Sequence, residues 1–158
     1  MIMNKKLRRK GLLLAPFLFL WYAWSLQACS QDDMEQGVPF VLVNETVNLR
    51  SPLYANLKVK KWAYLPDAGA RGILLVKDND FTYRAYDRFC PYRIEDSDCG
   101  LVEANPLGAG LDFVCNCGGC KSTFSWHNGA PRSGPAKRML QKYKVTMLTD
   151  GLIRITNH

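Results

Sequence analysis

The folded part of the chain consists of short apolar runs rather than long periodic ones. Residues 57–64 and 81–88 alternate between apolar and polar positions, and residues 72–77 are mostly apolar. Alternation predicts strands with one buried face, and a short apolar run bounded by turn residues predicts a strand buried on both faces. Five more runs predict further strands, at residues 38–43, 46–50, 111–115, 143–148 and 152–156. No run keeps a 3.6-residue period, so the pattern predicts an all-β fold.

Turns are predicted between some of these runs. Thr149-Asp150-Gly151 is typical of a hairpin turn between the last two strands, and Asn44-Glu45 is a second candidate for a tight turn. Residues 51–56 are expected to form a turn or a single helical turn.

The N-terminal region has a different pattern. A basic segment, residues 1–10, precedes a thirteen-residue apolar run at 12–24. That run is shorter than the roughly 20 residues of a membrane span and is typical of a signal peptide. The following Leu26-Gln27-Ala28-Cys29 resembles the lipobox of bacterial lipoproteins. This implies a signal peptide over residues 1–28, cleavage before Cys29 and a lipid on its sulfur; an ordinary secretory peptide is the alternative.

Residues 29–37 are mostly polar and acidic, which predicts a flexible tether. The tract resembles the acidic segment that sends some Gram-negative lipoproteins to the cell surface, although a simple solvated spacer has the same composition. Together the two resemblances imply an exported protein whose lipid on Cys29 anchors it to a bacterial outer membrane or cell surface.

The net charge of +7 comes mostly from the N-terminal region. Five of the 21 basic residues and none of the 14 acidic ones precede Cys29, which leaves 16 basic and 14 acidic residues. No basic stripe interleaves with aromatic residues in the remainder, so we expect no nucleic-acid partner.

Candidate chemistry is concentrated in cysteines. Cys115, Cys117 and Cys120 lie within six residues, with Gly118 and Gly119 between the last two. A C-x-x-C pair places two thiolates within reach of one ion, as in zinc and iron–sulfur sites. A second, weaker box is Cys90-Pro91-Tyr92. No Ser-His-Asp, Cys-His or paired-carboxylate pattern is present, so we do not predict hydrolytic catalysis.

The order of these parts resembles the Rieske 2Fe–2S family over about residues 38–156. The family's second box ends in Ser-x-Phe, as in Ser122-Thr123-Phe124, and a Gly-Pro loop like Gly134-Pro135-Ala136 covers its cluster. The resemblance implies a Rieske-like β-sandwich or barrel over residues 38–158, with a small cysteine-bearing subdomain at about 90–124. It also implies an electron-transfer or binding protein, rather than a stand-alone enzyme, that meets a redox protein partner.

The resemblance implies Cys90, Cys117 and Cys120 as cluster ligands. Tyr92 stands where the family has its first histidine and Cys120 where it has its second, and neither of the chain's histidines falls in a box. The fourth ligand would be Cys99, Cys115 or Tyr92. Thiolates in place of imidazoles lower the reduction potential of such clusters, so any cluster here would have a low potential.

Two alternatives to a 2Fe–2S cluster remain open. The same sulfurs suit a structural zinc ion, and an exported protein can instead form disulfides. Five cysteines follow Cys29, so disulfides alone would leave one thiol unpaired in a monomer. Under either alternative the chain is a non-redox surface lipoprotein that keeps the fold.

The lipid anchor gives the first testable prediction. We expect Cys29→Ser to move the protein from the membrane fraction to the soluble fraction, because acyl chains on that sulfur would supply the anchor. Fractionation with detection of the mature N-terminus measures this. A variant that stays membrane-bound and uncleaved would show that residues 12–24 are the anchor.

Overall fold

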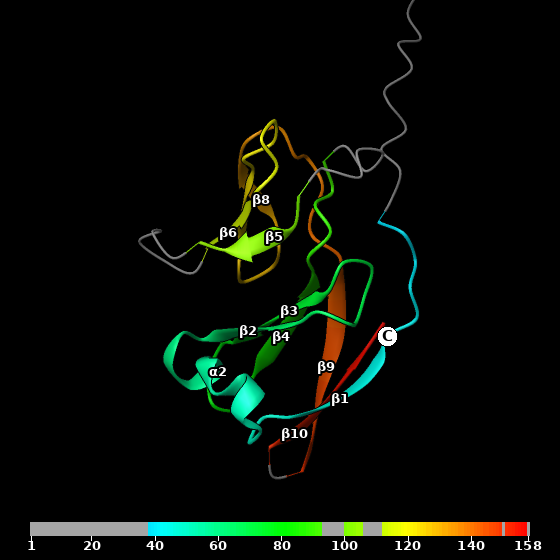
Figure 1. Cartoon of the computed structure of the whole chain (residues 1–158), viewed down its shortest axis with the longest axis vertical. Helices are drawn as coiled ribbons and strands as arrows, with labels where there is room; N and C mark the ends of the chain where they lie inside the picture. Colours follow the sequence, from blue (N-terminus) through cyan, green and yellow to red (C-terminus); the bar gives the residue numbers. More distant parts are fainter. Residues whose placement is uncertain (1–37, 93–99, 106–111, 150, 158) are drawn as a thin grey trace, which may run out of the picture. The chain divides into compact units, whose positions relative to one another are not determined.

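The computed structural model describes residues 38–92, 100–105, 112–149 and 151–157 (Figure 1). The predicted signal peptide, the tether, Cys29 and Cys99 lie outside the described residues. Two antiparallel sheets contain most of the regular secondary structure of the described chain, which confirms the all-β prediction there. Within the described residues no helix is long and apolar enough to cross a membrane.

The larger sheet has six strands in the order β1-β10-β9-β4-β3-β2. Its strands are β1 (Asn44–Asn48), β2 (Trp62–Leu65), β3 (Ile73–Lys77), β4 (Tyr83–Asp87), β9 (Lys142–Thr149) and β10 (Leu152–Thr156). A 3₁₀ turn, η1 (Pro52–Tyr54), and a short helix, α2 (Asn56–Val59), connect β1 to β2. The hairpin between β9 and β10 forms as predicted, with Leu152 paired to Thr149 and Gly151 at a φ of 81°.

The smaller sheet has four strands in sequence order, β5 (Val102–Ala104), β6 (Asp112–Cys115), β7 (Thr123–Ser125) and β8 (Pro131–Ser133). Cys115 is the last residue of β6, and Cys117 and Cys120 lie in the connection from β6 to β7, whereas Cys90 follows β4 of the larger sheet. The described cysteines therefore belong to the smaller sheet and its connections, apart from Cys90.

Two apolar clusters account for the arrangement of the sheets. Residues of one face of the larger sheet pack against one another in a single cluster. Leu75, Ala85 and Ile153 are among its buried residues. On the other face, Leu74 and Tyr86 pack against Phe113 of the smaller sheet. Strand β3 contributes to both clusters, and its first four residues have no exposed surface. This explains the uninterrupted apolar run that the sequence shows there.

Two local predictions were wrong and a third was right only in part. The strand predicted at residues 57–64 begins at Trp62, because residues 57–59 belong to α2 and Lys61, at a positive φ of 70°, separates the two elements. Asn44-Glu45 is no turn, because both residues pair with β10. Residues 38–43 are not a strand, although the side chain of Asn157 bonds the backbone of Val41 and Val43.

A buried carboxylate connects the larger sheet to the first cysteine loop. Asp87, at the end of β4, has no exposed surface. Its oxygens accept hydrogen bonds from the backbone N–H groups of Ala70 (2.6 Å), Arg71 (3.3 Å) and Phe89 (2.8 Å). The hydroxyl of Tyr143 on β9 donates a fourth bond of 2.7 Å. Asp87 therefore fixes the backbone one residue before Cys90.

We expect Asp87→Asn to lower the free energy of unfolding by about 2–4 kcal/mol, because an amide group cannot accept all four bonds and hydrogen bonds to charged groups are the stronger ones. Asp80→Asn is the matched control: Asp80 is an exposed partner of Lys77, and its loss should leave the free energy of unfolding nearly unchanged, because exposed ion pairs contribute little. Urea unfolding measures both. Equal, small effects would contradict the role given to Asp87.

Candidate metal centre

Three separate segments of the chain bring three thiols together. Cys90 follows β4, Cys115 is the last residue of β6, and Cys120 closes the turn before β7. Their sulfur atoms all lie within 4.8 Å of one another. The Sγ atoms of Cys90 and Cys120 are 3.7 Å apart, and neither they nor Cys115 are in a disulfide.

The thiols lie in an apolar environment. The exposed fractions of Cys90, Cys115 and Cys120 are 2%, 0% and 4%, and Phe124 is among the apolar residues of the same buried cluster. Hydrogen bonding to the Cys115 thiol, followed by burial, raises the pKa of the Cys90 thiol. Without a cation the Cys90 thiol therefore stays protonated near neutral pH, whereas a bound metal ion would deprotonate its thiol ligands.

Hydrogen bonds of Ser122 position Cys120. The Cys120 thiol donates to Ser122 Oγ at 3.1 Å, and the Ser122 backbone N–H donates to Cys120 Sγ at 3.4 Å. The same Oγ accepts a 3.0 Å bond from the N–H of Ala136. Gly134, at a φ of 87°, comes so close that an added Cβ would lie 2.5 Å from Ser122. The Gly-Pro-Ala loop is thus tied directly to the residue that holds the third sulfur.

The other predicted site residues have different positions. Cys117 is half-buried and does not belong to the group of three sulfurs. Tyr92 packs against the same apolar cluster as a partly buried side chain. Cys115, which the sequence offered only as a possible fourth ligand, is the fully buried member of the group.

Strand pairing explains why Cys115 turns inward. Phe113 and Cys115 alternate with two half-buried residues on β6, and Cys115 pairs with Val102 on β5. The strand ends at Cys115 and a turn follows at residues 118–120. Cys117 therefore does not continue the alternation that places Cys115 in the core. Cys115 lies two residues after Phe113 and therefore faces the same side of the strand. This spacing is the signal in the sequence that could have identified Cys115 as a buried residue.

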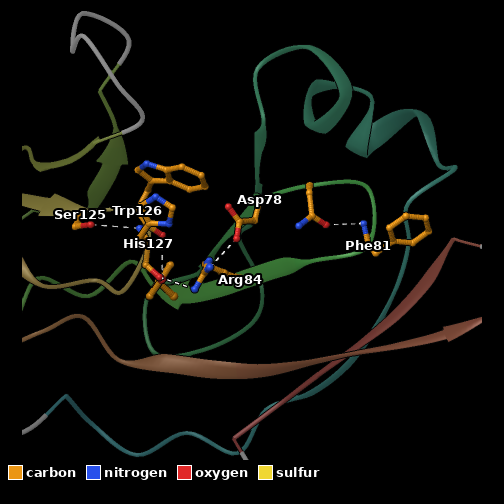
Figure 2. Close-up of polar contacts among 8 residues, drawn as sticks. Asp78, Phe81, Arg84, Ser125, Trp126 and His127 are labelled. Atoms are coloured by element: carbon orange, nitrogen blue, oxygen red, sulfur yellow. Dashed lines mark hydrogen bonds and ion pairs between the residues drawn. The ribbon is translucent and has the colours of Figure 1, made fainter.

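His127 takes no part in the sulfur group. Its ring stacks on Trp126 at a centroid distance of 4.1 Å. Figure 2 shows Arg84 between Asp78 and His127: the guanidinium donates 2.6 Å and 2.7 Å bonds to the Asp78 carboxylate and the His127 carbonyl. These contacts tie the β7–β8 loop to β4 of the larger sheet.

The donor set fits some metal groups better than others. The two-cysteine, two-histidine ligation of a Rieske cluster does not fit, because the described residues bring no histidine to the sulfurs. A tetrahedral ion with metal–sulfur bonds of about 2.3 Å separates its sulfurs by about 3.8 Å. The 3.7 Å between Cys90 and Cys120 matches that separation. The three thiols therefore suit one ion that they share.

Comparison with protein-family models, with curated proteins and with solved structures finds no match to this chain.

The environment of the thiols predicts an order of chemical modification. In reduced, metal-free protein, we expect iodoacetamide to modify Cys117 well before Cys90, Cys115 and Cys120. The thiolate is the reactive form, and burial together with the raised pKa of Cys90 suppresses it. Peptide mass spectrometry over time measures the order, with urea-unfolded protein as the control in which these differences disappear. Modification of Cys90 as fast as Cys117 in the folded protein would contradict the buried arrangement.

Proposed function

We propose that this chain is an exported, lipid-anchored metalloprotein whose folded domain binds a metal ion through Cys90, Cys115 and Cys120. The observation that carries the proposal is the convergence of three buried sulfurs within 4.8 Å from three separate segments. Buried thiols lose their hydration without gaining strong hydrogen bonds, whereas a metal ion bonds each thiolate directly. Thiolate ligands favour soft or borderline ions such as zinc and iron.

A single tetrahedral ion is the occupant that the distances support best. Zinc in a site closed by protein sulfurs acts as a structural staple. Here it would join the loop after β4 to strand β6 and to the turn before β7. The domain would then be a surface-attached module without redox chemistry, which was one of the alternatives that the sequence left open.

A 2Fe–2S cluster with an electron-transfer role is the second candidate, and one contact favours it. The Ser122-Thr123-Phe124 segment and the Gly134-Pro135-Ala136 loop, which carry the resemblance to the Rieske family, meet through the Ala136 N–H and Ser122 Oγ. Such a loop over the sulfurs is what the resemblance implies. A cluster ligated mainly by thiolates would have a low potential and would pass electrons to a redox protein partner.

The two substitutions Cys115→Ser and Cys117→Ser form a matched test of the proposal. We expect protein purified without oxygen to contain about one metal ion per chain. Cys115→Ser should lose that ion because it removes one of the three converging sulfurs, and Cys117→Ser should keep it. Elemental analysis and acid-labile sulfide measure the content, and circular dichroism checks that both variants fold.

Each other outcome has a definite meaning. Iron with equimolar sulfide would establish the cluster in place of the single ion. Loss of the metal from Cys117→Ser and its retention in Cys115→Ser would return the ligand set to Cys90, Cys117 and Cys120. Absence of metal in the unmodified protein, with disulfides present, would refute the proposal.

A further inference from the structure

The outer face of the six-stranded sheet is covered over only part of its width. Leu74 of β3 and Tyr86 of β4 pack against the smaller sheet on this face. Tyr86 pairs with Lys142, so Lys142 projects from β9 on the same side, where it is exposed. Strands β9, β10 and β1 therefore extend this face beyond the residues that the smaller sheet covers.

The uncovered strands present cations on this face. Strand register places Lys144, Thr156 and Asn44 in one row across β9, β10 and β1, and Thr146, Arg154 and Thr46 in the next. Arg154 Nε donates a 2.8 Å bond to Asn44 Oδ1, which confirms that the two rows share one side. The described positions of these rows contain no carboxylate, because Glu45 pairs with Ile155 on the opposite side. We call Lys142, Lys144 and Arg154 the basic face.

Two exposed apolar residues precede β1. Phe40 and Leu42 are 78% and 80% exposed, whereas the next residue, Val43, is buried in the core. The Asn157 side chain accepts a 2.6 Å bond from the Val43 N–H and donates a 2.9 Å bond to the Val41 carbonyl. The backbone that carries Leu42 is therefore held against the end of β10 and is not a free tether.

We propose that the basic face, together with Phe40 and Leu42, rests on an anionic lipid surface. Cations near such a surface gain electrostatic attraction, with about a fivefold change in binding for each, and exposed apolar side chains enter the interface. The inference rests on the proposed lipid on Cys29, which lies eleven residues before Phe40. A chain of that length spans at most about 40 Å, so the anchor holds this edge of the sheet near the bilayer.

The test uses the lipidated full-length protein in nanodiscs, with one protein per disc. Amide hydrogen exchange of peptides covering residues 38–48 and 142–156 is compared between phosphatidylglycerol-containing discs and pure phosphatidylcholine discs. We expect severalfold slower exchange of residues 38–43 in the anionic discs, and loss of that protection at high salt, because salt screens the attraction. The triple variant Lys142→Gln, Lys144→Gln, Arg154→Gln should lose it too, as should Phe40→Ser with Leu42→Ser.

The matched control removes the same charge elsewhere. Lys58, Lys60 and Lys61 are exposed lysines at and beyond the end of α2, and their triple change to Gln should leave the protection intact. Equal exchange in both kinds of disc, or equal loss in both triple variants, would overturn the proposal. Protection that is absent with one protein per disc and appears only in discs loaded with two would overturn the proposal and show that the face binds a second copy instead. Failure of the lipid anchor is seen separately, as protein without acyl mass that does not enter discs.

Discussion

The buried carboxylate of Asp87 is the interaction on which both the sheet and the candidate site depend. Its four donors come from the loop before β3, from Phe89 in the segment after β4 and from β9. Burial, and then the bond to Asp87, raises the pKa of Tyr143, so that hydroxyl stays protonated and donates. Because an ionised carboxylate has a high cost of burial without donors, this arrangement permits little freedom in the backbone that leads into Cys90.

A second constraint acts at the sulfurs. Cys90, Cys115 and Cys120 are removed from water by apolar residues that both sheets contribute. Ser122 then fixes the third sulfur through two bonds and holds the 134–136 loop through a third. A group of three thiols with such support is prearranged on the protein side, so a metal ion would need to order little of the described chain when it binds.

Parts of the fold follow from the sequence and others do not. The apolar run of β3 and the hairpin of β9 and β10 were predictable, since burial on both faces and a Thr-Asp-Gly turn each leave a clear pattern. The first half of the 57–64 prediction failed because alternation over residues 57–60 alone is too short to distinguish a strand from one helical turn. Strands β5, β7 and β8 have three residues each, which is too short to produce a period of two.

The candidate site shows the same limit. Spacing identifies Cys117 and Cys120 as a pair, since C-x-x-C needs no knowledge of the fold. Cys115 enters the group only because β6 pairs with β5 and ends at Cys115, and β5 has only three residues, too few to predict that pairing from a period of two. Local sequence therefore identifies the cysteine-rich loop, whereas tertiary pairing selects which sulfurs face one another.

X-ray absorption at the metal edge tests the central claim most directly, because it measures the ligands of the ion in the unmodified protein. The account predicts one shell dominated by sulfur at about 2.3 Å, with no second metal nearby. A metal–metal distance would show that the sulfurs are divided between two ions. A shell of nitrogen and oxygen alone would contradict the assignment of the three thiols as ligands.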